Sequence, residues 1–161
     1  VMMALEGVPA FYIHSLIATE NDVERIEHTG SFRSINRRVW DADQLEQQLS
    51  TETHHKKVFE AMQSLLKVRR KQPAFHPNAT MYTLHTGESL FAFWRQSINR
   101  SQSIFAVYNI TNEPQTFNLS QLNLVITDEW TDLVSGEVFD DRLALVTLRP
   151  YQYLWLTNKP V

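Results

Sequence analysis

The most informative stretch of this chain for its fold is residues 7–38, GVPAFYIHSLIATENDVERIEHTGSFRSINRR. It opens with an apolar run, residues 8–13, and continues into a polar segment that ends in the arginines Arg33, Arg37 and Arg38. A continuously apolar run bounded by turn residues is typical of a strand buried on both faces of a parallel sheet. In such sheets, ligands bind at the loops that follow the carboxyl ends of the strands. The sequence therefore predicts a buried strand followed by a candidate anion-binding loop.

Composition narrows the classes of protein. The 161 residues are 43% hydrophobic, which suffices for one domain with a core or for a small domain and a fragment. A net charge of -3 gives no general attraction to nucleic acid or membranes, and no apolar stretch reaches the roughly 18 to 20 residues that span a bilayer. The absence of cysteine excludes disulfides and a thiol nucleophile. We expect a cytoplasmic protein, because the first residues also lack the features of a secretory signal.

Helical periodicity follows the arginines. Asp41 is suited to cap a short helix over residues 41–49, and a longer helix is expected from residue 51 or 53 to about residue 71. The apolar residues of the longer helix form one stripe, which predicts packing on a larger body: Val58, Phe59, Met62, Leu65 and Leu66. Its basic end is either an anion patch or, as we favour, a solvated end that complements the helix dipole: Lys67, Arg69, Arg70 and Lys71.

From His76 onward the periodicity changes to that of strands. Turn residues separate eight candidates: residues 81–85, 90–95, 104–110, 115–119, 124–126, 137–139, 143–148 and 151–157. Short strands at this spacing predict an antiparallel sandwich. The expected core is Phe91, Phe93, Phe105, Val107, Trp130, Leu154 and Leu156, whereas Tyr153 and Trp155 should face the other way. These aromatics are either packing, which we favour, or a platform for stacking carbohydrate. The domain boundary is expected near residues 73–77, giving domains 1–75 and 76–161.

The residues with chemical potential form few constellations. No spacing of the six histidines predicts a metal site, and adjacent His54 and His55 cannot act as an i, i+4 pair. His14 is more often structural than catalytic in such a setting, and the carboxylates of residues 22–27 suit the first turn of a short helix, 22–28, better than acid–base chemistry. A guanidinium can hold phosphate or carboxylate with two hydrogen bonds. From residue types alone, Arg33 is either such a ligand or a structural arginine, whereas a structural role is favoured for Arg37 and Arg38.

A family resemblance makes the interpretation specific. The segments GVPAFYIHSL, END and HTGSFRSINRR resemble the last barrel strand and following loop of sucrose phosphorylases and their close relatives, which include glucosylglycerate and glucosylglycerol phosphorylases. These are retaining enzymes of the α-amylase superfamily, glycoside hydrolase family 13. The segments SLLKVRRKQPAF, LFAFWR, AVYNITN, WTDLVSG and PYQYLWL are similar too, in the family's helix and C-terminal β-sandwich. The resemblance covers nearly the whole chain.

This resemblance implies a double displacement. An aspartate attacks the anomeric carbon, a glutamate protonates the leaving alcohol, and phosphate then takes the glucosyl group with net retention. No residue of this chain matches either carboxylate, so we expect no catalytic residue, no metal and no cofactor here, with inorganic phosphate as co-substrate. The family's phosphate- or acceptor-holding arginine falls on Arg33, and Arg37 is the second arginine of the same R-x-I-N-R motif.

The combined expectation is an α+β fragment, the last βα unit of a TIM (β/α)8 barrel followed by an all-β antiparallel sandwich. It would be the C-terminal part of a parent enzyme that acts on sucrose or a similar α-glucoside, and it would be inactive alone. The first forty residues would self-associate or pack in a non-native way, or the parent would dimerise. The alternatives are an amylase-like hydrolase and a carbohydrate-binding or purely structural sandwich. The sequence does not identify the acceptor.

Overall fold

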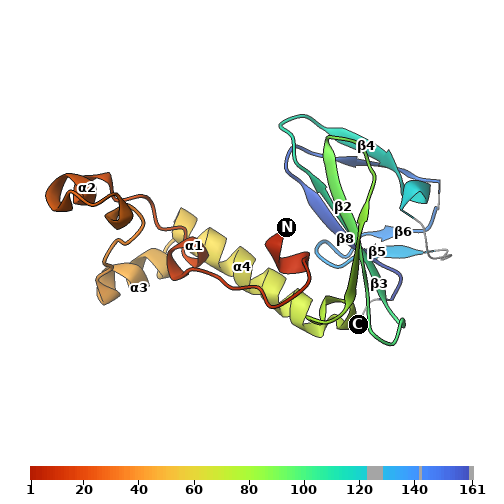
Figure 1. The fold of residues 1–161 in the computed structure, drawn as a ribbon, viewed down its shortest axis with the longest axis horizontal. Coiled ribbons are helices and arrows are strands. Elements are labelled where there is room, and N and C mark those ends of the chain that lie inside the picture. The colour runs from red at the N-terminus through yellow and green to blue at the C-terminus, as the bar shows by residue number, and fades with distance from the viewer. Residues whose placement is uncertain (123–128, 142, 160–161) are drawn as a thin grey trace. The chain divides into compact units, whose positions relative to one another are not determined.

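The protein is described by a computed structural model that covers residues 1–122, 129–141 and 143–159 (Figure 1). The chain divides into two compact units. The sandwich unit combines Val1–Pro9 with Lys67–Val161, and the helical unit is the continuous segment Ala10–Leu66. The helical unit is therefore an excursion of the chain between two parts of the sandwich unit. The predicted domain limits, 1–75 and 76–161, stay a prediction.

Helices make up the regular structure of the helical unit, as capping residues in the sequence predict. They are α1 (Ile13–Leu16), α2 (Val23–Thr29), α3 (Ala42–Ser50) and α4 (His54–Lys71), whose last turns belong to the sandwich unit. The carboxylate of Asp22 accepts a hydrogen bond of 3.0 Å from the amide of Arg25, and that of Asp41 accepts one of 3.1 Å from Gln44. Both bonds satisfy amides of a first helical turn. The predicted cap at Asp41 and the predicted helices are thus confirmed.

The apolar stripe of α4 remains half-exposed. None of its five predicted members is fully buried, and 36% of Val58 is exposed. A one-sided apolar stripe is typical of a helix that packs on a neighbour. The predicted packing of this stripe on a larger body stays a prediction.

The buried strand predicted over residues 8–13 is wrong for this chain. Residues 8–12 have no regular structure, and Ile13 starts the short helix α1. Their side chains are not buried either, since 78% of Val8 and 48% of Tyr12 are exposed. A parallel strand needs neighbouring strands to accept and donate its backbone hydrogen bonds. No strand pairs with this run in the part of the chain that the structure describes.

Two antiparallel sheets form the sandwich unit. One has the order β1-β2-β3-β8-β5-β6, with β1 (Thr80–Leu84), β2 (Leu90–Gln96), β3 (Ser103–Asn109), β8 (Tyr153–Thr157), β5 (Trp130–Asp132) and β6 (Val138–Phe139). The other pairs β4 (Gln115–Asn118) with β7 (Leu145–Leu148). Seven predicted strands are confirmed with shifted ends, β5 was not predicted, and the predicted strand 124–126 lies outside the described residues.

The hydrophobic core lies between the two sheets. Strand alternation directs Phe105 and Val107 of β3 inward, together with Leu154 and Leu156 of β8. Phe117, Val146 and Leu148 of the smaller sheet and the buried Trp130 complete the contacts. This confirms the antiparallel sandwich and most of its predicted core.

The outer face of the larger sheet carries a second set of aromatic side chains. Phe91 and Phe93, predicted for the inner core, lie on this face, because their neighbours Leu90 and Ala92 point inward. Phe93 is fully buried there, and it packs on Tyr108 with the ring centroids 5.9 Å apart. Trp155 shares the outer face, as predicted, and its ring packs on that of Phe75 in an edge-to-face arrangement with the centroids 4.9 Å apart. The prediction is therefore wrong about the face for both residues, and it is right about burial for Phe93 but not for Phe91, which is only half-buried.

Candidate functional site

The arginine loop, residues 29–38, starts where α2 ends. Gly30 terminates the helix with a φ of 64°, a left-handed conformation that glycine adopts without strain. A single 3-10 turn, Phe32–Ser34, follows, and Arg33 lies at its centre. The buried Ser34 hydroxyl donates a hydrogen bond of 2.6 Å to the carbonyl of Ser31. The backbone that carries Arg33 is therefore held by its own short-range hydrogen bonds.

Two further hydrogen bonds tie the arginine loop to earlier residues of the helical unit. The amide of Asp22 donates to the carbonyl of Ile35 at 2.7 Å. The phenol of Tyr12 donates to the carbonyl of Asn36 at 3.0 Å, so the apolar run and the arginine loop do meet, although the run is not a strand. Both bonds join the loop at residues that directly follow the 3-10 turn. They give the loop a defined conformation with exposed side chains.

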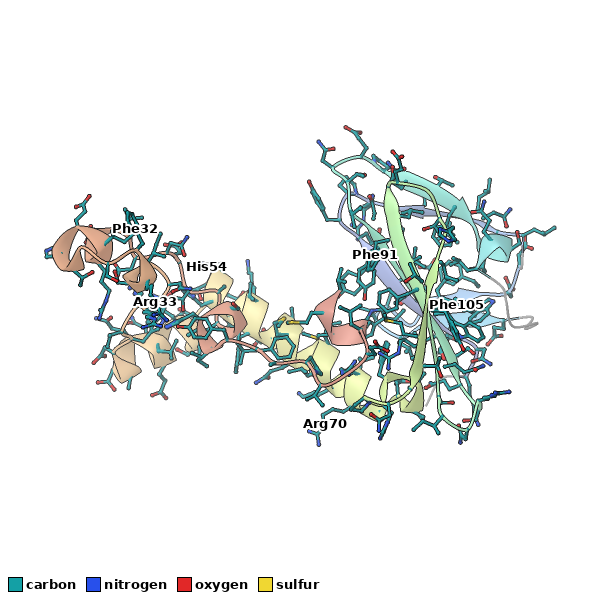
Figure 2. All side chains as sticks on the ribbon, viewed as in Figure 1. Phe32, Arg33, His54, Arg70, Phe91 and Phe105 are labelled. Atoms are coloured by element: carbon teal, nitrogen blue, oxygen red, sulfur yellow. The ribbon has the colours of Figure 1, made fainter. Side chains whose placement is uncertain are left out.

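Arg33 and Arg37 line the same open depression of about 420 Å³ (Figure 2 labels Phe32 and Arg33). Its remaining walls are Tyr12, Phe32, Ile35 and Asn36, so no carboxylate lines it. Both arginine side chains are exposed, and neither guanidinium makes a hydrogen bond or ion pair with another described residue. A guanidinium without an acidic partner keeps all five of its donors for an external anion. The structure thus brings the two predicted site residues together.

Sequence reasoning missed the aromatic walls of this depression. The sequence predicts Tyr12 in a buried strand, yet its ring lies at the surface with the arginines. Phe32 is 84% exposed and stands next to Arg33 in the chain. An exposed ring beside free hydrogen-bond donors is suited to contact an apolar face of a ligand. The available signal was the pair Phe32-Arg33 within a polar loop.

Arg38 differs from the other two arginines. Its guanidinium lies over the ring of Trp40, with 4.3 Å between the guanidinium carbon and the ring centroid, a cation–π contact. The depression of about 430 Å³ that Arg38 lines also includes the carboxylate residues Glu20, Asp22 and Glu24. A site with three carboxylates repels phosphate. Arg38 therefore fits the structural role that the sequence favoured.

The histidines of the helical unit make local contacts. His55 is buried, and its Nδ1 lies 2.7 Å from the carbonyl of Ile17, which can only accept, so Nδ1 carries the proton. The Nδ1 atom of His14 lies 3.1 Å from the Thr19 hydroxyl, which also accepts a hydrogen bond of 2.9 Å from Trp40 Nε1. No group of three or more potential ligands among the described residues could hold a metal ion. These contacts fit the structural role that the sequence favoured for His14.

The basic end of α4 is not uniformly solvated. Arg70 and Lys71 are exposed, as the sequence led us to expect, but Arg69 is only 7% exposed. Its guanidinium donates to backbone carbonyls of the first residues of the chain. The expectation of a solvated end is therefore wrong for Arg69.

Comparison with known proteins places this geometry in context. No protein-family model matches the chain. A glucosylglycerate phosphorylase of Spirochaeta thermophila is 32% identical over 167 residues, covering 98% of this chain and 28% of the relative. A sucrose phosphorylase of Bifidobacterium adolescentis is 26% identical over 145 residues, covering 89% of this chain and 26% of the relative. The chain thus spans about a quarter of the length of the relatives it matches.

Solved structures support the same fold. An α-amylase of Anoxybacillus superposes with a TM-score of 0.73 at 16% identity, covering 99% of this chain and 31% of the amylase chain. At that identity the match indicates a shared fold only. The fold is thus that of the corresponding part of this amylase chain. In sequence, the chain is a homologue of the C-terminal part of the glucoside phosphorylases, namely those named for glucosylglycerate, sucrose and glucosylglycerol. The resemblance stated from the sequence is confirmed.

No helix within the described residues has the length and apolar character that crossing a membrane requires.

Proposed function

We propose that this chain is the C-terminal part of a retaining glucoside phosphorylase. The parent converts sucrose, or a similar α-glucoside, and phosphate into α-glucose 1-phosphate and the free acceptor. In this proposal, residues 8–38 supply the last strand and the following loop of the TIM barrel in the parent. The cytoplasmic location and the self-association expected from the sequence stay predictions beside it.

The observation that carries the proposal is the free arginine pair. Arg33 and Arg37 share one depression, and no carboxylate lines it. Phosphate is the anion for which a guanidinium provides two parallel charge-assisted hydrogen bonds. A hydrolase that uses water as its acceptor has no need of such donors. The arginine pair therefore favours phosphorolysis over amylase-like hydrolysis.

The arginines supply binding and orientation in this mechanism. Phosphate held by the guanidinium groups has its oxygens fixed for attack on the glucosyl intermediate, which lowers the entropic part of the barrier. The positive charges also favour the deprotonated, nucleophilic form of phosphate. We assign the nucleophile and the general acid–base of the double displacement to sequence outside these 161 residues. Arg33 is the principal phosphate ligand and Arg37 the second.

The sandwich acts as a structural body in the proposal. The aromatic side chains that a carbohydrate platform would need are largely buried, with exposed fractions of 0% for Phe93 and 1% for Trp130 and Trp155. Buried rings stabilise a core and cannot stack on sugar. A glucan pull-down with residues 76–161 tests the alternative of a binding module, and retention on glucan would support that alternative.

The deciding experiment is an assay of the full-length product of the gene that encodes this chain. Release of glucose 1-phosphate is measured with sucrose, glucosylglycerate and glucosylglycerol, with and without phosphate. We expect phosphate-dependent release with at least one substrate and no release by the 161-residue chain alone. Sugar release that is independent of phosphate would overturn the proposal in favour of a hydrolase, and glucose 1-phosphate from the 161-residue chain would overturn the expected inactivity.

A further inference from the structure

Arg95 is a fully buried arginine on the outer face of the larger sheet. It lies near the end of β2 and is 0% exposed. One terminal nitrogen donates to the carbonyl of Ala4 at 2.8 Å, and the other donates to those of His76 at 2.9 Å and Ala79 at 3.3 Å. No carboxylate among the described residues forms an ion pair with it. Backbone carbonyls thus satisfy the two terminal nitrogens of Arg95, whereas its buried Nε has no hydrogen-bond partner.

Arg69 repeats this arrangement from the end of α4. Its two terminal nitrogens donate to the carbonyls of Met3 and of Gly7, the latter at 3.1 Å. The guanidinium carbons of Arg69 and Arg95 lie 5.5 and 6.0 Å from the centroid of the Phe75 ring. The two arginines therefore share one aromatic ring and together hold the first residues of the chain.

Placing two like charges in this position is costly. Desolvation by burial lowers the pKa of Arg95 to about 10, and the neighbouring Arg69 charge acts in the same direction. Apolar side chains would cover the sheet at less cost. What apolar side chains cannot do is donate to the carbonyls of an irregular segment, and buried carbonyls need donors. The arginines thus specify one conformation for residues 3–7.

The residues that the two arginines hold lie beside the connection from the sandwich unit to the helical unit. The chain leaves the sandwich unit at Pro9 and returns to it at Lys67. Arg69 lies two residues after Lys67, where the chain re-enters the sandwich unit. Its side chain donates to Gly7, which lies two residues before Pro9, where the chain leaves that unit. The amide of Gly7 adds a bond of 3.1 Å to the carbonyl of Pro77. Arg69, at the connection that returns to the sandwich unit, therefore fixes Gly7, at the connection that leaves it.

We propose that Arg69 and Arg95 form a latch that locks residues 3–7 onto the sandwich and so acts as a positioning device for the arginine loop. The latch closes the base of the excursion that carries Arg33 and Arg37. Its role in positioning rests on the proposed function, whereas its existence as a separate unit of structure does not. Neither arginine of the latch contacts the depression that Arg33 lines, so neither is a catalytic residue.

The latch is tested first in the 161-residue chain by hydrogen exchange. Arg69→Lys keeps the charge and the apolar stem, but one ammonium cannot reproduce the fork that reaches two carbonyls. Loss of one charge-assisted bond is expected to reduce protection of the Gly7 amide by roughly 10- to 100-fold. Protection of Val107, in the middle of β3, should change by less than about threefold because its opening is separate. Arg70→Lys, the exposed neighbour, is the matched control and should change neither amide.

Two hydrogen-exchange outcomes would overturn the latch. Unchanged protection of the Gly7 amide in Arg69→Lys would show that the guanidinium hydrogen bonds of Arg69 do not stabilise residues 3–7. An equal loss at Gly7 and Val107 would show that Arg69 is an ordinary part of the core with no separate opening. If Arg69→Lys does not fold, Arg95→Lys gives the same readout from the other arginine.

The positioning role is tested in the full-length gene product. Arg69→Lys should raise the KM for phosphate by about 10-fold while kcat stays within about twofold, because a misplaced ligand weakens binding more than chemistry. Arg70→Lys should leave both constants unchanged. Opening at Gly7 with an unchanged KM would overturn the positioning role. Absence of phosphorolysis in the unmodified protein would instead refute the proposed function, and the hydrogen-exchange result would still decide the latch.

Discussion

The guanidinium of Arg95 donates a hydrogen bond of 2.8 Å to the carbonyl of Ala4, which lies 91 residues earlier in the chain. The bond is buried at both ends, since both residues are 0% exposed. It joins the start of the chain to β2, a strand of a sheet that forms entirely from later residues. The start of the chain is therefore an integral part of the sandwich unit.

Replacement of Arg95 by methionine is expected to destabilise the sandwich unit by about 3 kcal/mol. The change removes three hydrogen bonds and leaves the carbonyls of Ala4, His76 and Ala79 without this donor. Urea denaturation of the 161-residue chain measures the effect, with Arg70→Met as an exposed control that should change stability by less than about 0.5 kcal/mol. An Arg95→Met chain as stable as the unmodified one would show that the buried charge costs as much as its bonds contribute.

The buried pair Tyr108 and Trp155 predicts a dependence of stability on alkaline pH. The indole Nε1 of Trp155 donates to the phenol oxygen of Tyr108 at 2.8 Å, and burial raises the pKa of Tyr108. Above about pH 10 the unfolded chain loses this proton and the folded chain keeps it. Stability therefore falls as pH rises, by about 1.4 kcal/mol per pH unit from this residue.

Tyr108→Phe tests this linkage. At pH 7 the variant should be less stable by about 1 to 3 kcal/mol, because Trp155 loses its acceptor. The difference should shrink between pH 10 and pH 11.5, because phenylalanine has no proton to lose. Urea denaturation at several pH values gives the two curves, with Tyr151→Phe as a control at a position that is 68% exposed. Curves that stay parallel would contradict the assignment of the alkaline effect to Tyr108.

Short-range rules predicted the local structure of this chain well. The cap at Asp41, the helix that starts after Asp22 and the alternation along β3 and β8 all depend on residues within one or two turns of each other. Such signals are complete in the sequence. The three-residue strand β5 was missed because it is too short to show alternation.

Predictions that depend on residues distant in the sequence were less accurate. Residues 8–13 have the composition of a buried strand, but a strand is defined by its neighbours and this chain supplies none to them within the described residues. Phe93 is as buried as predicted, yet which face it occupies depends on the register of Leu90 and Ala92. Arg69 and Arg70 are identical in type and adjacent, and Arg69 is the buried one because residues 3–7 pass on its side of the helix and accept its hydrogen bonds.

The candidate site shows the same limit. The position of Arg33 in the R-x-I-N-R motif could be predicted, together with its chemistry toward anions. That its guanidinium has no acidic partner, whereas that of Arg38 lies over Trp40, depends on side-chain placement that no spacing rule contains. The hydroxyl of Tyr12 on the carbonyl of Asn36 was equally out of reach, because it spans 24 residues.

His55 and His54 offer a matched test of the helical unit. His55→Leu removes the buried donor to the carbonyl of Ile17 and should destabilise this unit by about 1 to 3 kcal/mol. Tryptic cleavage within residues 10–66 should become roughly 10-fold faster or more, since it follows the population of the opened state. His54 is exposed, and His54→Leu should leave the rate nearly unchanged. Equal effects of the two changes would contradict the structural role of the His55 hydrogen bond.

Arg33 is the proposed phosphate ligand. Arg33→Met in the full-length gene product should reduce kcat/KM for phosphate by roughly 10- to 100-fold, the effect of losing one or two charge-assisted hydrogen bonds. Folding stability should change by less than about 0.5 kcal/mol, because the side chain is exposed and has no partner among the described residues. Steady-state kinetics at varied phosphate and urea denaturation measure the two quantities.

Arg38→Met is the control that separates a phosphate ligand from a general positive charge. It removes the same charge from the same loop, but its guanidinium lies over Trp40 and its depression is lined by carboxylates. We expect less than about a threefold change in kcat/KM for phosphate, since a charge screened by salt and by its own acidic neighbours acts weakly at a distance. Arg37→Met should fall between the two. Equal losses in Arg33→Met and Arg38→Met would mean that the loop acts only through its net charge, and the assignment of Arg33 as the phosphate ligand would then be wrong.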